Sequence, residues 1–189
     1  MSQMLRTFIA VEIGPDVQKS LKTIQEHLKT PGADVKWVNP SIIHLTLKFL
    51  GEIPSEKVKK VSEWLPEISV RFGRIRTSIN HLGVFPSSGM PRVVWAGMEE
   101  NAEQLIHLAQ SLEEALGKIG FAKEKKSFHP HVTLGRVRSS RCCDQLRKAI
   151  QEYAFPSPLT FSVEKIIFFQ STLTPQGSIY TPLTIVPLK

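Results

Sequence analysis

Two short stretches of the chain carry the same pattern of imidazole, hydroxyl and apolar side chains. They are His44-Leu45-Thr46-Leu47 and His131-Val132-Thr133-Leu134, and an offset of 87 residues separates them. Successive side chains of a β-strand point to opposite faces, so the imidazole and the hydroxyl of each stretch point the same way. If the two strands face each other, two imidazoles and two hydroxyls line one cleft.

These groups suit phosphodiester chemistry that needs no metal. An imidazole with an ordinary pKa of about 6.5 can remove a proton from an attacking oxygen when neutral, or protonate a departing oxygen when charged. The hydroxyls of Thr46 and Thr133 can donate to the non-bridging phosphate oxygens and hold the phosphorus between His44 and His131. We therefore expect an acid and base pair of histidines, with both threonines binding phosphate.

A zinc site is the competing chemical interpretation. His129 and His131 lie two residues apart, and His44 could supply a third nitrogen. Threonine is a poor zinc ligand, and Pro130 between the pair limits strand geometry, so the sequence favours a site with no metal and no cofactor. His27, His81 and His107 share no recurring pattern, and we expect ordinary roles for them. Neither a phosphate-binding Gly-x-x-x-x-Gly-Lys loop nor a dinucleotide-binding Gly-x-Gly-x-x-Gly motif is present.

Apolar spacing and turn residues predict the elements that must position the two motifs. The expected strands are 6–13, 43–50, 74–84, 92–98, 131–137, 160–169 and 179–186, and the expected helices follow Pro15 and cover about 54–65, 101–119 and 142–153. The shift of 87 residues maps one half of this order onto the other. We expect an α+β fold with two lobes related by a pseudo-two-fold axis. Antiparallel sheets would line a central cleft, with helices outside, and residues 1–189 would form a single domain of two intertwined, similar lobes.

Composition limits the classes of protein that fit. The chain has 189 residues, 41% hydrophobic and 22% charged, which excludes a disordered or coiled-coil protein. No apolar run is long enough to cross a bilayer, and the two cysteines, Cys142 and Cys143, are adjacent, so we expect a cytoplasmic protein without a membrane partner. A net charge of +7 favours partners that carry phosphate.

Several stretches beyond the two motifs carry a resemblance to a known family. They are Arg6-Thr7-Phe8-Ile9-Ala10, Trp37-Val38, the run from Ile43 to Gly51, the run from Phe128 to Arg136, and Ser171-Thr172-Leu173 with Gly177 and Tyr180. With them the sequence resembles the 2H phosphoesterase superfamily, and within it the RNA 2′,3′-cyclic phosphodiesterases, also called 2′-5′ RNA ligases.

The resemblance implies hydrolysis of an RNA-terminal or nucleoside 2′,3′-cyclic phosphate to a 2′-phosphate. It assigns His44 as proton donor to the leaving 3′ oxygen and His131 as proton acceptor from water, with Thr46, Thr133 and Arg136 on the phosphate. The expected partners are RNA with cyclic phosphate ends, such as tRNA halves, or small cyclic nucleotides, and a cleft complete in one chain predicts a monomer. Lys48 and Phe49 are weaker candidates, expected to be solvated and in the core respectively.

Two alternative functions stay open from the sequence. The reverse chemistry would join a cyclic end to a 5′-hydroxyl as a 2′-5′ linkage with the same histidines. A binding module would instead hold an RNA end without turnover, using the basic surplus and aromatic residues such as Phe8, Trp37 and Phe128 near the motifs.

Overall fold

The computed structural model describes residues 3–175 and 177–189. In chain order the elements are β1 (Met4–Glu12), α1 (Pro15–Lys29), β2 (Val35–Trp37), the 3₁₀ turn η1 (Pro40–Ile42), β3 (His44–Pro54), α2 (Ser55–Ser69), β4 (Ile75–Phe85), β5 (Val93–Met98), α3 (Ala102–Lys118), β6 (His131–Val137), α4 (Cys143–Glu152), β7 (Leu159–Val163), β8 (Lys165–Thr174) and β9 (Gly177–Pro187). Four helices therefore accompany a sheet of nine strands among the described residues, which confirms the expected α+β class.

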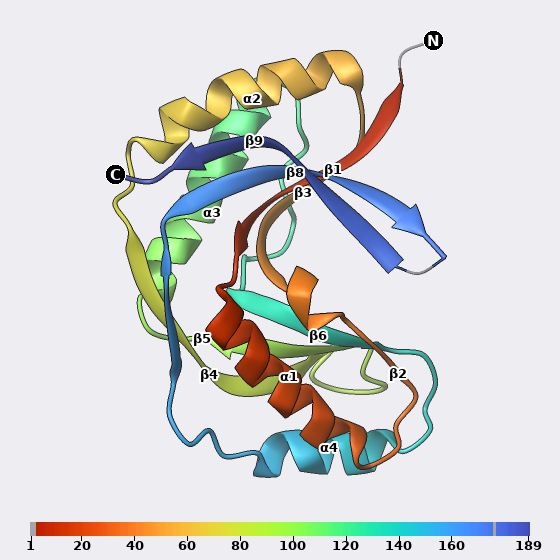
Figure 1. Cartoon of the computed structure of the whole chain (residues 1–189). Helices are drawn as coiled ribbons and strands as arrows, with labels where there is room; N and C mark the ends of the chain where they lie inside the picture. Colours follow the sequence, from red (N-terminus) through yellow and green to blue (C-terminus); the bar gives the residue numbers. More distant parts are fainter. Residues whose placement is uncertain (1–2, 176) are drawn as a thin grey trace.

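The strand order of the sheet is symmetric about its centre. It runs β7-β4-β5-β6-β3-β1-β8-β9 with antiparallel pairing, and β2 is added beside β6. We call β3, β1, β8 and β9 the first lobe, and β6, β5, β4 and β7 with β2 the second lobe. In each lobe the His-x-Thr strand lies at the centre of the sheet and three further strands follow it toward the edge. Both lobes belong to one curled sheet (Figure 1). The lobes join at a single registered pair between the described residues of β3 and β6, Leu45 with Val132.

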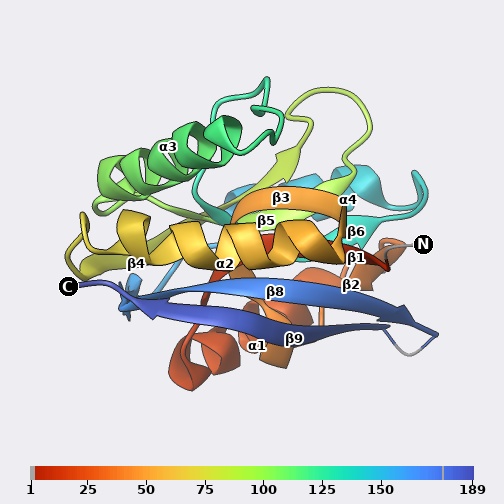
Figure 2. The same cartoon turned by 90° about the horizontal axis from the view of Figure 1, so that it is seen from above.

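Two of the helices, α1 and α3, contact the lobe opposite to the strand that each one follows. α1 follows β1 of the first lobe but contacts β7 and α4 of the second lobe, whereas α3 follows β5 of the second lobe and contacts β3 and α2. Figure 1 shows α1 with α4 at one end and α2 with α3 at the other, and Figure 2 shows α2 lying along β8 and β9. Because each lobe is covered by a helix from the other half of the sequence, neither half can bury its core alone.

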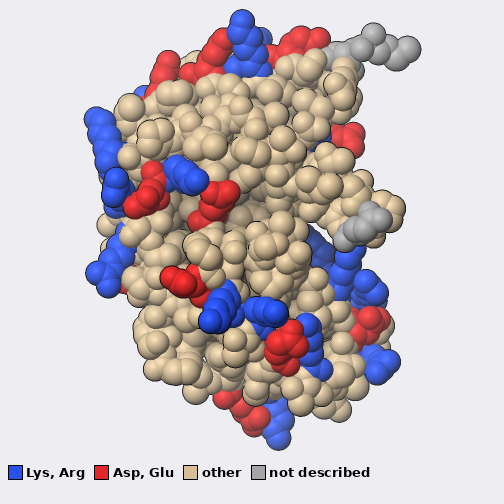
Figure 3. Space-filling model, viewed as in Figure 1, with Lys and Arg blue, Asp and Glu red and all other residues tan. Residues whose placement is uncertain are grey.

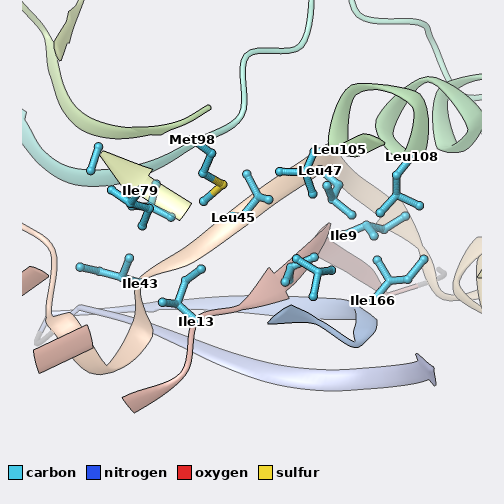
Figure 4. Packing of buried hydrophobic residues seen from close by; sticks show 14 of the residues in the cluster. Ile9, Ile13, Ile43, Leu45, Leu47, Ile79, Met98, Leu105, Leu108 and Ile166 are labelled. Atoms are coloured by element: carbon cyan, nitrogen blue, oxygen red, sulfur yellow. The ribbon is translucent and has the colours of Figure 1, made fainter. Parts of the chain in front are cut away.

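Apolar residues at helical spacing turn each helix toward this core. In α1, Pro15 occupies the first turn, and Val17, Leu21, Ile24 and Leu28 are buried. The buried stripe of α3 packs against the apolar residues of the first motif, since Leu45 and Leu47 lie in one cluster with Leu105 and Leu108 (Figure 4). The apolar residues of the His-x-Thr strands therefore anchor these strands in the core.

The single strand expected over residues 160–169 is wrong. The chain forms β7, which pairs with β4, and then β8, which pairs with β1, so it passes between the lobes at Glu164. The apolar run continues on both sides of Glu164 without a glycine or proline, and nothing local marks this crossing. No helix of the described residues has the length and apolar content needed to span a membrane.

Candidate active site

The two His-x-Thr motifs meet where the lobes join. Leu45 and Val132 are fully buried and paired, so the flanking residues of each motif point to the opposite face of the sheet. Because the pairing is antiparallel, Thr133 lies across from His44, and Thr46 lies across from His131. The predicted histidines and threonines are all half-buried on this concave face, in a diagonal arrangement of two imidazoles and two hydroxyls.

Both catalytic candidates are held by the same backbone contact. His44 Nδ1 lies 2.8 Å from the carbonyl oxygen of Ile42, and His131 Nδ1 lies 2.6 Å from the carbonyl oxygen of His129. A carbonyl oxygen only accepts, so Nδ1 carries the hydrogen in each ring. Nε2 is therefore the nitrogen of each histidine left for proton transfer, and it acts as a base when the ring is neutral and as an acid when it is charged.

Aromatic side chains of the first lobe surround His44. The ring of His44 lies 4.9 Å from that of Phe8 and 5.1 Å from that of Tyr180, and Phe8 stacks on Phe169 at 5.3 Å. Phe8, Phe169 and Tyr180 belong to a small apolar cluster on the concave face, separate from the main core. Burial among these groups lowers the pKa of His44, and the bond to the Ile42 carbonyl opposes part of that effect.

His131 has corresponding surroundings in the second lobe. Its ring lies 5.2 Å from Phe85 and 6.1 Å from Trp95, and Trp95 stands 87 residues after Phe8. Burial lowers the pKa of His131, the bond to the His129 carbonyl raises it, and the nearby His129 ring lowers it further. Both imidazoles therefore favour the neutral form in the free protein more strongly than an unperturbed histidine does.

A β-bulge decides where Arg136 points. The β5–β6 register shifts between Val94 and Trp95, leaving Leu134 as an extra residue of β6. Leu134 and Val137 both pack on the core, so Arg136 projects from the opposite face, which is that of His131. Strict alternation would place Arg136 on the same face as Leu134, toward the core. The bulge instead places Arg136 on the face of the cleft. Arg136 is exposed there, so its guanidinium is available to an anion.

A corresponding bulge in β3 overturns two minor expectations. The β1–β3 register shifts between Ile9 and Ala10, so Leu47 and Lys48 both face the core, and Phe49 faces the cleft. Lys48 is therefore buried rather than solvated, and its Nζ lies 2.6 Å from Oε1 of Glu113. Phe49 is 53% exposed rather than in the core, with its ring 6.1 Å from that of Phe8.

Sequence reasoning missed His81, which lies on β4, one strand away from His131 on β6. Gly97 pairs with His81 on one side and with His131 on the other, and the His81 ring covers Gly97 where a side chain would otherwise stand. His81 Nδ1 lies 2.8 Å from Oδ1 of Asn80, and its ring lies 6.5 Å from that of His129. Burial lowers the pKa of His81, as does the neighbouring His129, while Glu99 raises it. No repeated motif marks this histidine in the sequence. Gly97 indicates the position of the His81 ring only once the pairing of β4 with β5 is known.

Gln25 is a second residue that the sequence did not single out. It stands among the apolar residues of α1 and is 2% exposed. Its Nε2 donates to the carbonyl oxygens of Val38 and Leu134, both at 2.8 Å. Leu134 is the bulged residue of β6, so this amide ties α1 to the feature that turns Arg136 toward the cleft. A lone polar residue within a helix's apolar stripe is the signal that could have found it.

The donors considered for a zinc site do not converge. The rings of His129 and His131 are 6.0 Å apart, and the described residues contain no group of three His, Cys, Asp or Glu side chains placed to hold a metal ion.

Cationic side chains gather beside the cleft. Figure 3 shows a hollow between the two halves of the molecule, with Lys and Arg along its edge below the β8–β9 hairpin and over the ends of β2 and β6. Lys36 on β2 pairs with Arg136 on β6, and both are exposed. A phosphate group that approaches the hydroxyls of the motifs therefore meets positive charge at the rim.

The sequence matches a family model described as LigT-like phosphoesterase twice, over residues 11–95 and 97–180, and each matched segment contains one His-x-Thr motif. An RNA 2′,3′-cyclic phosphodiesterase of Thermotoga maritima is 36% identical over 95% of this chain and 93% of that protein. A protein of the same name from Archaeoglobus fulgidus is also 36% identical, over 96% of this chain and 99% of its own.

Solved structures give the same result for the fold. A protein of Thermus thermophilus superposes with a TM-score of 0.80 at 30% identity, covering 97% of this chain and 98% of its own. Escherichia coli LigT in complex with 3′-AMP superposes with a TM-score of 0.79 at 26% identity, covering 99% of both chains.

Proposed function

The chain belongs to the LigT-like phosphoesterases of the 2H superfamily and is a phosphodiesterase that hydrolyses RNA 2′,3′-cyclic phosphates; we propose that His44 and His131 perform this hydrolysis as a matched acid and base. The relatives' names supply the substrate class, and the geometry of the two motifs supplies the chemistry. The observation that supports the proposal is the repeated contact of Nδ1 with a backbone carbonyl, which leaves Nε2 of both histidines available for proton transfer.

The reaction requires two proton transfers at opposite sides of the phosphorus. Neutral His131 accepts a proton at Nε2 from water, whose oxygen attacks the phosphorus of the cyclic ester. Charged His44 donates a proton from Nε2 to the departing 3′ oxygen as its bond to phosphorus breaks. The products are a 3′-hydroxyl and a 2′-phosphate, and the enzyme is left with His44 neutral and His131 charged, so one net proton exchange restores it.

The threonines and Arg136 stabilise charge on the phosphate during attack. Because Thr133 lies across from His44 and Thr46 across from His131, the two hydroxyls flank the line between the imidazoles. Each hydroxyl can donate to a non-bridging oxygen, and the Arg136 guanidinium adds charge-assisted donors from the rim. The phosphate anion favours the protonated state of His44, which offsets the effect of burial on the pKa of this residue.

The substrates that we propose are RNA ends with a terminal cyclic phosphate, tRNA halves among them, and small 2′,3′-cyclic nucleotides. The cleft draws its histidines, threonines and Arg136 from one chain, which supports action as a monomer. We propose the cytoplasm as the location of the protein.

The identity of the product tests the proposed leaving oxygen. We expect 2′,3′-cyclic AMP and an RNA with a cyclic end to yield 2′-phosphates in the presence of EDTA, resolved from 3′-phosphates by phosphorus NMR and chromatography. A 3′-phosphate product would contradict the assignment of the 3′ oxygen as leaving group. Adding an RNA with a 5′-hydroxyl to the same reaction would reveal any 2′-5′ joined product.

A further inference from the structure

The two lobes differ at one edge, although the rest of the sheet is symmetric. In the second lobe, residues 135–137 of β6 pair with β2 on the side that faces the first lobe. The shift of 87 residues maps 135–137 onto 48–50 of β3, and it maps β2 onto residues 122–124. Among the described strands, none pairs with residues 48–50 on that side, and residues 122–124 form a loop.

Two sequence differences accompany the missing strand. Gly135 has no side chain, which lets Val35 and Trp37 of β2 pack directly over its backbone. The corresponding residue in the first lobe is Lys48, whose buried side chain occupies that place, with Nζ 3.0 Å from the carbonyl oxygen of Ala122. The loop residues Lys123-Glu124-Lys125-Lys126 also lack the apolar alternation that buries Val35 and Trp37.

The loop is fixed in position although it is not a strand. One carboxylate oxygen of Glu113 on α3 accepts from Lys48 Nζ at 2.6 Å, and the other accepts from the backbone N–H of Glu124 at 3.2 Å. The open edge of β3 and this loop enclose a groove of about 540 Å³, lined by residues 48–50 and 121–126. The groove therefore has the unpaired edge of β3 as one wall and the loop as the other.

Neighbouring aromatic rings connect the groove with the cleft that contains His44. Phe49 lines the groove, its ring lies 6.1 Å from Phe8, and the Phe8 ring lies 4.9 Å from His44. On the loop side, Lys123, Lys125 and Lys126 are exposed. Exposed lysines on a loop next to a half-exposed aromatic ring are the groups that bind the backbone and bases of single-stranded nucleic acid.

We propose that this groove binds the nucleotides that precede the cyclic phosphate end of a single-stranded RNA. Phe49 offers a ring face to a base, and the three lysines contact the phosphates on its 5′ side, so the strand leads out of the cleft along β3. This inference rests on the proposed function and adds a second site to it. An extended peptide could also pair with the open edge of β3, but the lysines and the continuity with His44 favour RNA.

Comparing a short RNA substrate with a mononucleotide substrate measures the contribution of the groove, because only the RNA has nucleotides that reach it. The variant Lys123→Ala/Lys125→Ala/Lys126→Ala is assayed on a short RNA with a 2′,3′-cyclic end and on 2′,3′-cyclic AMP. We expect the ratio of kcat/KM for RNA to kcat/KM for cyclic AMP to fall about tenfold at about 50 mM salt. The dependence of kcat/KM for RNA on salt should weaken by about two units of logarithmic slope, because up to three phosphate contacts are lost.

A matched variant controls for net charge. Lys19→Ala/Lys22→Ala/Lys29→Ala removes three exposed lysines from α1, which packs on the second lobe, and should leave the ratio unaltered. If the loop variant keeps the wild-type ratio of kcat/KM for RNA to kcat/KM for cyclic AMP, the proposal that the groove binds RNA is overturned. An equal loss of both activities keeps that ratio and has the same consequence. If the wild-type protein hydrolyses neither substrate, fluorescence anisotropy with the same RNA ending in a 2′-phosphate still tests the groove, and equal binding by both triple variants would contradict it.

Discussion

Leu45 and Val132, the middle residues of the two His-x-Thr motifs, are paired across β3 and β6 at the junction of the lobes. This one pair fixes the relative position of the four candidate side chains, His44, Thr46, His131 and Thr133, because the residues on either side of it point to the concave face. It also explains why the motifs are duplicated, since a strand from each half supplies one imidazole and one hydroxyl.

The pH dependence of catalysis follows from the direction of the two pKa shifts. Burial lowers the pKa of both His44 and His131 in the free protein, so the form with one charged and one neutral imidazole is most populated below their ordinary value. We expect a bell-shaped profile of kcat/KM with its maximum on the acid side of that value. The profile of kcat should lie at higher pH, because the bound phosphate raises the pKa of His44. A maximum of kcat/KM well above pH 7 would contradict these directions.

The threonine hydroxyls should matter more for kcat than for KM. Thr46→Val and Thr133→Val keep the shape and strand propensity of the side chain but remove the donor to the phosphate. We expect kcat for 2′,3′-cyclic AMP to fall about 10- to 100-fold in each variant, because the donors act most strongly on the charge of the transition state. Thr→Ser variants restore a hydroxyl and should recover most of this loss. Equal kcat values for the Val and Ser variants would show that the hydroxyls do not contact the phosphate.

Gln25 should act through the bulge at Leu134. Gln25→Leu removes two hydrogen bonds to the carbonyl oxygens of Val38 and Leu134. We expect the free energy of unfolding to fall by about 1–3 kcal/mol and kcat/KM to fall with it, because Arg136 loses its direction. In a background that already carries Arg136→Gln, the substitution should cost stability but little further activity. An additive loss of activity in the double variant would place the effect of Gln25 elsewhere.

A side chain at Gly97 should destabilise the protein while the His81 ring covers this position. A Cβ at Gly97 would overlap the His81 ring and also approach Trp95, which contacts His131. We expect Gly97→Ala to lower the free energy of unfolding by about 1–3 kcal/mol. Adding His81→Ala should recover part of that loss in thermal denaturation, because the overlapping ring is gone. A Gly97→Ala protein as stable as the wild type would contradict the packing described for this part of the cleft.

The sequence predicted the features that repetition makes visible. His44, Thr46, His131 and Thr133 recur at a fixed offset, and the structure brings them to one face of the sheet. Apolar spacing along the chain, together with the repeat, predicted the order of strands and helices and hence the α+β class. Their roles in catalysis stay predictions until the variants are measured.

The features that escaped prediction depend on contacts between distant residues. The bulges in β3 and β6 invert the faces of Lys48 and Phe49 and turn Arg136 to the cleft, because an extra residue shifts the alternation without changing local composition. The crossing at Glu164 likewise depends on which partner strand is available on each side. His81 stands alone in the sequence, and its position beside the site depends on Gly97 in the neighbouring strand.

The measurement that tests the matched acid and base most directly is the pH profile of residual kcat/KM in His44→Asn and His131→Asn. Asparagine keeps an N–H donor for the carbonyl that each Nδ1 contacts and removes Nε2, and His107→Asn on the exposed face of α3 serves as the control. We expect each site variant to lose about 10²- to 10⁴-fold in rate. His44→Asn should lose the fall at high pH, and His131→Asn should lose the fall at low pH. Activity within tenfold of wild type in either variant, or loss of the same limb in both, would contradict a mechanism with one acid and one base.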